Sequence, residues 1–324
     1  MKKMSMTLAS CAMAMMLTVS GCYAGGRNVV KPSKNYVTEK VSISDIEAIK
    51  SSSSVDVVYT QASGTPYAEI YAPDNIVPLI KVEQDGKTLR IGFKSNTSIN
   101  GRYKCEVRVF APEVTSFSTS SSSDITLANG LKTSKPVTLK ASSSGDIDAS
   151  SLACGDLSMT TSSSGDIKIG TITCGMLSLD TQSSGDIKAG TITCAMLALD
   201  TQSSGEIKLA SATCTGATIE SSSSGDCVVS EMACSGDVKA STSSSSDIKL
   251  AGTCRNASFS ASSAGNIYAK DLLAKDVEAR ASSAGDIECN ASGVLSTSVS
   301  SAGGVRYKGE PARVEGKIKG VSKL

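Results

Sequence analysis

The sequence predicts an all-β fold, a right-handed parallel β-helix of about 20-residue coils with an irregular β cap at its N-terminal end. A Ser-Ser-Gly-Asp motif returns every 20 residues, and a cysteine returns at the same interval. A fixed period of this length is typical of a solenoid, in which each unit stacks on copies of itself. Between the motifs apolar residues alternate with polar ones, as in strands. The crossover rule favours the right-handed form.

The repeats align in columns when they are superposed on their glycines. From Gly145 to Gly205, apolar residues stand two, four, seven, twelve and fourteen positions after the glycine, for example at Ile167, Ile169, Ile172, Leu177 and Leu179. Each coil is therefore expected to hold three short strands, and neighbouring coils should lie about 4.8 Å apart. The glycine column is Gly145, Gly165, Gly185, Gly205 and Gly225, and the cysteine column is Cys154, Cys174, Cys194, Cys214, Cys234 and Cys254.

Residues 1–22 have the pattern of a bacterial lipoprotein signal peptide. Lys2 and Lys3 precede an apolar run, and Val19-Ser20-Gly21-Cys22 resembles a lipobox, with cleavage before Cys22 and lipidation of its thiol. A short transmembrane anchor is the alternative, although the run is short for a span. Residues 23–35 form a tether. Because Tyr23, and not Asp, follows the cysteine, the pattern favours an outer-membrane lipoprotein facing the periplasm or the exterior.

Residues 36–126 are β-rich without the 20-residue period. Alternating segments predict half-buried strands, Asn75 to Gln84 predicts a short helical turn, and Gln84-Asp85-Gly86-Lys87 predicts a hairpin. This region is expected to form the first irregular coils and to cover the open end of the solenoid, because an uncovered end would expose unpaired strand edges. The repeats then occupy residues 127–303, and residues 304–324 form a C-terminal cap and tail.

Several of these segments resemble a known family. Ile46-Glu47-Ala48-Ile49, Val55 to Gln61, Gly86 to Ile91, the Ser-Ser-Gly-Asp-Ile repeats and Gly304 to Pro311 are similar to the auto-transporter adhesin "head GIN" domain of Bacteroidetes lipoproteins. The resemblance covers about residues 38 to 312. It implies a β-helical extracytoplasmic domain with no catalytic residues to carry over. The length of the repeat array and the cysteine column depart from the usual family pattern.

Composition narrows the function classes. The net charge of +1 gives no indication of nucleic-acid binding. The chain has no histidine, so a Ser-His-acid triad cannot be built from its serine runs. Those runs are expected to fill tight corners, where their hydroxyls bond to the backbone and to one another. No cofactor is expected.

The candidate binding surface is a polar stripe on the outer face of the coils. Stacked carboxylates should repel by about 1 kcal/mol per pair in water. Lysines two residues further on can offset this repulsion in a mixed-charge stripe. The alternative is divalent cations such as calcium held between the coils. The stripe comprises Asp146, Asp166, Asp186, Glu206, Asp226, Lys168, Lys188 and Lys208.

The cysteine column points inward by its parity with the apolar columns. Buried free thiols are the expected state. Disulfides between neighbouring coils are the alternative, because the compartment permits oxidation, although parallel side-chain directions would strain them. A single file of thiols does not enclose zinc tetrahedrally, so no metal is expected there.

These observations predict a non-enzymatic envelope lipoprotein, anchored to the membrane through Cys22, whose repetitive polar face binds an envelope or extracellular protein or glycan. A carbohydrate-binding module and a polysaccharide-degrading β-helix enzyme are the alternatives. A pocket of non-repetitive acids and bases that interrupts the outer face would favour the enzyme.

Overall fold

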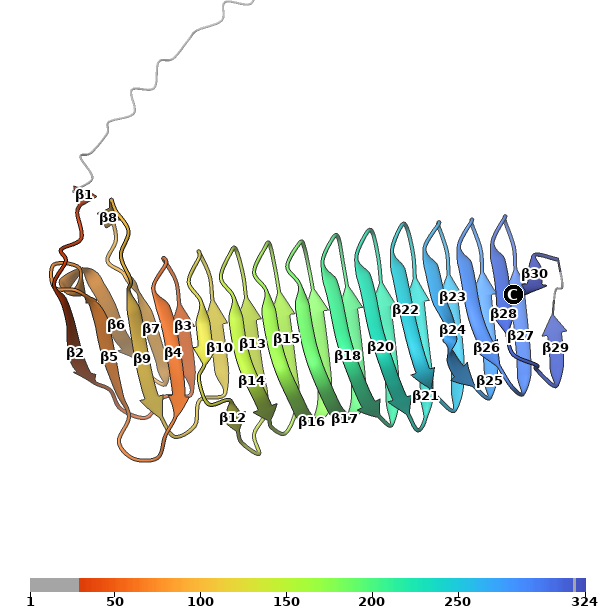
Figure 1. Ribbon diagram of the computed structural model, residues 1–324, viewed down its shortest axis with the longest axis horizontal. Helices are drawn as coiled ribbons and strands as arrows, with labels where there is room; N and C mark the ends of the chain where they lie inside the picture. The colour runs from red at the N-terminus through yellow and green to blue at the C-terminus, as the bar shows by residue number, and fades with distance from the viewer. Residues whose placement is uncertain (1–28, 317–318) are drawn as a thin grey trace, which may run out of the picture.

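The computed structural model describes residues 29–316 and 319–324, which form one long β-solenoid (Figure 1). It has about 10 turns with coils of about 20 residues, so the predicted fold is confirmed. Residues 20 apart lie side by side in parallel strands, as Ile167, Ile187 and Ile207 do. The predicted lipidation residue, Cys22, lies outside the described residues. No helix among the described residues is long and apolar enough to cross a membrane.

Among the described residues, antiparallel pairing occurs in the N-terminal cap. Strand β2 (Tyr36–Ser42) pairs with β5 (Tyr67–Pro73), which pairs with β9 (Glu106–Ala111). Strands β6 (Ile80–Asp85) and β7 (Thr88–Phe93) form the predicted hairpin. The predicted helical turn is a 3₁₀ helix, η1 (Val77–Leu79). Two short strands, β1 (Val29–Val30) and β8 (Ser98–Ile99), pair beside the cap.

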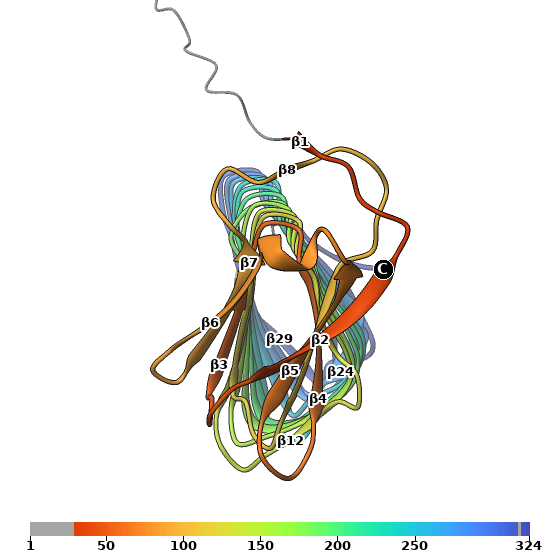
Figure 2. The ribbon, with the colours of Figure 1, turned by 90° about the vertical axis from the view of Figure 1, so that its left-hand side faces the viewer.

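The cap continues directly into the coils. Strand β7 pairs in parallel with β3 (Ala48–Ser51), which pairs in parallel with β10 (Ser116–Thr119). In the same way, β9 pairs with β4 (Asp56–Gln61), and β4 pairs with β11 (Ile125–Leu127). The end-on view shows the cap strands crossing the open end of the solenoid (Figure 2). The cap therefore covers the edges that the first coil would otherwise expose.

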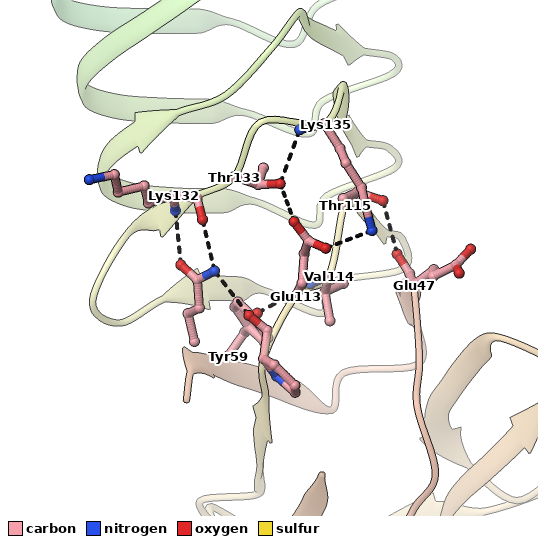
Figure 3. Close-up of polar contacts among 10 residues, drawn as sticks. Glu47, Tyr59, Glu113, Val114, Thr115, Lys132, Thr133 and Lys135 are labelled. Carbon is pink, nitrogen blue, oxygen red and sulfur yellow. Dashed lines mark hydrogen bonds and ion pairs between the residues drawn. The ribbon is translucent and has the colours of Figure 1, made fainter. Parts of the chain in front are cut away.

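A polar network fastens the cap to the first repeats (Figure 3). The buried Tyr59 hydroxyl donates to the Ala111 carbonyl at 3.1 Å and accepts from the Val114 N–H at 3.3 Å. Lys135 pairs with Glu113 at 2.6 Å, and this contact holds the pKa of Glu113 below its usual range. The Tyr59 ring also packs edge-on against Phe117, with ring centroids 5.1 Å apart.

The repeats run from β12 to β28, each strand pairing in parallel with its counterpart in the next coil. In β16 and β17 the three predicted short strands run on as one bent strand per coil. The strands are β12 (Leu131–Lys132), β13 (Val137–Ala141), β14 (Ile147–Ala153), β15 (Leu157–Thr161), β16 (Ile167–Thr181), β17 (Ile187–Thr201), β18 (Glu206–Cys214), β19 (Gly216–Ser221), β20 (Asp226–Cys234), β21 (Asp237–Thr242), β22 (Asp247–Thr253), β23 (Asn256–Ala261), β24 (Asn266–Ala274), β25 (Asp276–Ala281), β26 (Asp286–Ala291), β27 (Val294–Val299) and β28 (Gly304–Lys308).

The apolar columns fill the bore of the solenoid. In the coil of Ile167 the five residues of the apolar columns are all buried, and Cys174 is half-buried. A further column is also buried but carries hydroxyls. Its members include Thr161, sixteen residues after Gly145, and Thr242, seventeen residues after Gly225. Their Oγ1 atoms donate to the carbonyls of Gly185 (3.0 Å) and Ser246 (2.8 Å), which satisfies backbone acceptors beside the turn.

The coils become irregular toward the C-terminus, where the spacing of the acidic column is 21 residues from Asp226 to Asp247 and 19 from Asp247 to Asn266. The pairing shifts register between Val229 and Met232 and again between Lys249 and Ala251, while the strands on either side stay aligned. The last described strands are β29 (Arg313–Gly316) and β30 (Val321–Lys323).

Candidate functional site

The acidic column forms a ladder with the backbone. The Asp166 N–H donates to Asp146 Oδ1 at 2.9 Å, and Asp166 Oδ1 in turn accepts from the Asp186 N–H at 2.9 Å. The Glu206 N–H continues the series on Asp186 Oδ1 at 3.1 Å. The side chains are half-buried. Each of the three aspartates therefore satisfies a backbone donor at the start of the next coil.

This ladder revises the expected balance of charge. The repulsion between stacked acids was expected to be offset by Lys168, Lys188 and Lys208. Within the part of the chain that the structure describes, only one of them makes an ion pair, from Lys188 to Asp186 at 2.9 Å. Backbone N–H groups are the partners of Asp146, Asp166 and Asp186 instead, because a carboxylate is a strong acceptor of charge-assisted hydrogen bonds. The series is interrupted at Glu206, where the Asp226 N–H donates to the Gly205 carbonyl at 3.2 Å. A hydrogen bond of the same kind, from a backbone N–H to an aspartate of the previous coil, recurs at another corner, where Asp156 accepts from the Met176 N–H at 2.8 Å.

The three lysines stack in adjacent coils, with Lys168 beside Lys188 and Lys188 beside Lys208. Lys168 and Lys208 are exposed and have no carboxylate partner within ion-pair distance among the described residues. A groove of about 270 Å³ runs along the column. Its floor is mostly apolar and includes Ile169 and Ala189.

An uncharged face of exposed threonines adjoins this groove and was not among the surfaces predicted from the sequence. Thr171 lies beside Thr191, and Thr173 beside Thr193, with all four side chains exposed. The recurring segment Thr-Ile-Thr-Cys at 171–174 and 191–194 was the available signal. The exposed side chains of Met176 and Met196 border the far side of this face.

The serine runs build the stacked turns at one corner. The backbone N–H of Ser184 donates to the Ser163 carbonyl at 2.8 Å, and that of Ser204 donates to Ser183 at 3.0 Å. Ser163 adopts a left-handed φ of 59°. Hydroxyl contacts go to the backbone, as from Ser142 Oγ to the Thr119 carbonyl at 2.9 Å. These contacts give the serines a structural place in the corner.

The cysteine column lies along the wall of the bore. Cys194, Cys214 and Cys234 are buried, and Cys154, Cys174 and Cys254 are half-buried. All six carry free thiols. Burial raises the pKa of the Cys174 and Cys214 thiols to about 12 and that of Cys194 to about 11. Thiols with raised pKa values are poor nucleophiles at neutral pH.

A non-repetitive charged cluster appears where the later coils shorten. Glu288 is only 5% exposed and lies between Lys270 (3.0 Å) and Arg306 (2.9 Å) from the neighbouring coils. Asp271 pairs with Lys308 at 3.1 Å. Because both cations hold the buried carboxylate, the cluster ties three coils together. Within residues 29–316 and 319–324, no three His, Cys, Asp or Glu side chains converge as metal ligands would.

Comparisons with solved structures give similar chains at low identity. A putative adhesin from Bacteroides fragilis is 22% identical, with 91% of this chain and 95% of that chain covered and a TM-score of 0.42. A putative adhesin from Parabacteroides distasonis is 19% identical, with 91% and 99% covered and a TM-score of 0.47. A chain from the same species described as a putative lipid binding protein is 19% identical, with 91% and 99% covered and a TM-score of 0.35.

No curated protein matches the chain. The family model described as "Putative auto-transporter adhesin, head GIN domain" matches residues 45–230 and 198–311. Together these matches span the cap, the repeats and the beginning of the C-terminal segment, which is far more than half of the chain. The resemblance noted in the sequence is therefore confirmed, and the chain belongs to the auto-transporter adhesin, head GIN domain family.

Proposed function

We propose that this protein is a non-enzymatic lipoprotein of the outer membrane, anchored through Cys22, whose repeated outer face binds a ligand by many equivalent contacts. The adhesin-like family supports a role at the cell envelope. The observation that carries the proposal is the repetition of one outward pattern in successive coils. Lys168, Lys188 and Lys208 stand in register beside the threonine face.

The physical advantage of such a face is multivalency. A single exposed lysine contributes little to affinity because solvent screens it. Contacts repeated at the strand spacing of about 4.8 Å act together on an extended ligand, and their combined affinity can exceed that of any one contact. The rigid solenoid fixes the spacing in advance, so little entropy is lost when the ligand binds.

A specific observation favours the second candidate, a carbohydrate-binding module. The lysine groove combines three ammonium groups with an apolar floor. Acidic sugars present carboxylates or sulfates on one edge and C–H groups on their faces, so both parts of the groove would find partners. The enzyme alternative has weaker support. The buried acid of the non-repetitive charged cluster is Glu288, and its carboxylate is already engaged in ion pairs with Lys270 and Arg306.

The test is an array of acidic and neutral polysaccharides, probed with the full-length protein in detergent. Single variants Lys168→Gln, Lys188→Gln and Lys208→Gln should each weaken binding by less than about fivefold, and the triple variant should abolish it. A control triple variant of exposed lysines elsewhere, Lys87→Gln, Lys132→Gln and Lys275→Gln, carries the same charge change and should bind normally. Loss of binding in the control, retention in the first triple variant, or release of new reducing ends would contradict the proposal.

A further inference from the structure

A second cleft, separate from the lysine groove, lies where the β6–β7 hairpin meets the first coils. Its volume is about 390 Å³. The end-on view shows β6 splaying away from the wall of the solenoid (Figure 2). The lining side chains come from four strands that are neighbours in one sheet, in the order β6, β7, β3 and β10, and from Ser52 and Ser120, which directly follow β3 and β10.

Small residues in one row across these strands create the hollow. Lys81 on β6 lies opposite Gly92 on β7. Next in the row come Ser52 and then Ser120, which is held by the hydrogen bond from its N–H to the Ser51 carbonyl at 3.1 Å. A Cβ at Gly92 would lie 3.0 Å from Ser52 Oγ. The row thus has one long side chain, Lys81, at its end and hydroxyls along its floor.

The adjacent row supplies positive charge. Arg90 and Lys50 lie directly opposite each other in the parallel pair β7–β3. Like charges at opposed positions are destabilising. Arg90 pairs with Asp85 at 3.2 Å, and Lys81 pairs with Glu83 at 3.0 Å. Lys50 is exposed and has no carboxylate partner within ion-pair distance among the described residues.

The lining therefore carries three cations and a single carboxylate, Glu83. We propose that the cleft binds a phosphate group, either free or on a lipid headgroup. The guanidinium of Arg90 and the ammonium groups of Lys50 and Lys81 would balance its charge, and the hydroxyls of the serine floor would donate to its oxygens. Arg90 already pairs with Asp85 and has Glu83 opposite it, so the charge that a bound phosphate would newly balance is that of Lys50.

The lining contains cations as well as hydroxyls, and this favours an anionic ligand over a neutral one. Neutral sugars would gain only hydrogen bonds to Ser52, Ser118 and Ser120, and the charge of Lys50 would remain unpaired. The volume exceeds that of one phosphate and lies in the range of small-molecule sites, so there is room for the group that carries the phosphate.

Calorimetric titration of the full-length protein in detergent tests the proposal. The probes are inorganic phosphate and dihexanoyl phosphatidic acid, with dihexanoyl phosphatidylcholine as the zwitterionic control. Lys50→Gln should weaken binding of the phosphate probes by at least about tenfold, because a charge-assisted contact is lost. Lys140→Gln is the matched control, since Lys140 lies in the same row beyond Ser118 but outside the cleft.

The two probes distinguish the sources of the group. Stronger binding of phosphatidic acid assigns the cleft to a lipid headgroup, and equal or stronger binding of inorganic phosphate assigns it to free phosphate; both results support the site if they depend on Lys50. Lys81→Gln provides a second variant on a different strand. Binding of neither probe, or equal binding by the Lys50→Gln, Lys81→Gln and Lys140→Gln variants, would overturn the proposal.

Discussion

Asp166 illustrates how a column of like charges can recur along a solenoid. Its N–H donates to Asp146, and its own Oδ1 accepts from the Asp186 N–H at 2.9 Å. The side chain thus replaces a backbone acceptor at the coil's first corner. Asn266 occupies an equivalent place and donates through its amide to Asp247 Oδ1 at 3.1 Å, so the column accepts a neutral amide.

Replacing Asp166 separates this role from cation binding. Asp166→Ala leaves the Asp186 N–H without its acceptor and should lower the free energy of unfolding by about 1–2 kcal/mol. Asp166→Asn keeps an acceptor oxygen and should cost less than about 0.5 kcal/mol. Urea unfolding measures both differences. If added calcium raised the free energy of unfolding of the unmodified protein, and both variants removed this effect equally, the carboxylates would instead hold cations between coils.

At the residue scale the sequence predicted which side chains point inward but not why the glycines recur. A Cβ at Gly185 would lie 2.3 Å from the Gly165 carbonyl oxygen, so only glycine permits this approach between coils. Such a contact joins residues 20 apart and appears only once the coils are stacked. The buried hydroxyl of Thr161 was missed for a similar reason, because its partner, Gly185, belongs to the next coil.

At the scale of the element, the burial of the cysteine column makes the stability of the fold depend on pH. The ordinary thiol pKa is 9.0, and in the folded chain it is about 12 for Cys174 and Cys214. Below pH 9 these thiols are protonated in both the folded and the unfolded chain, so they contribute no pH dependence. Above pH 9 the unfolded chain ionises first, and this difference destabilises the fold until the folded thiols also ionise near pH 12.

Thermal unfolding between pH 8 and pH 11 should therefore show stability that falls with pH. The double variant Cys174→Ala and Cys214→Ala should reduce the slope, and the wild-type protein at pH 8 sets the reference. Labelling with iodoacetamide in the native state should likewise be slow at pH 8, because the reactive thiolate is scarce. Rapid labelling of these positions at pH 8, or an unchanged slope in the double variant, would contradict this account.

The elements of the repeats were predictable because their partners lie a constant distance away in the chain. The strand pairing of the cap was less predictable. Its hairpin follows from the local turn at Gly86, but the antiparallel pairing of β2 with β5 and of β5 with β9 joins segments with no repeated spacing. The cleft of Lys50 depends on this arrangement, since Lys50 and Arg90 are neighbours only after β3 and β7 pair.

At the scale of the whole molecule, each coil contacts mainly its neighbours, so stability is close to a sum of coil and interface contributions. The lysine groove and the threonine face extend over successive coils of this stack. The cleft between the β6–β7 hairpin and the first coils, proposed to bind phosphate, lies at its capped end. The long rigid body separates the two sites, and each can be altered without the other. The distance between them is fixed by the number of coils.

Duplicating residues 165–224, which comprise three coils, tests the central claim that coils of this length are interchangeable units. The repeated segment should insert in register, keep a cooperative β-sheet melt, and lengthen the particle by about 14 Å, three times the strand spacing, in small-angle X-ray scattering. Duplicating residues 165–214 instead adds 50 residues and breaks the period, so that variant should aggregate or lose stability. An unchanged maximum dimension for the first variant, or equal behaviour of the two, would contradict the solenoid account.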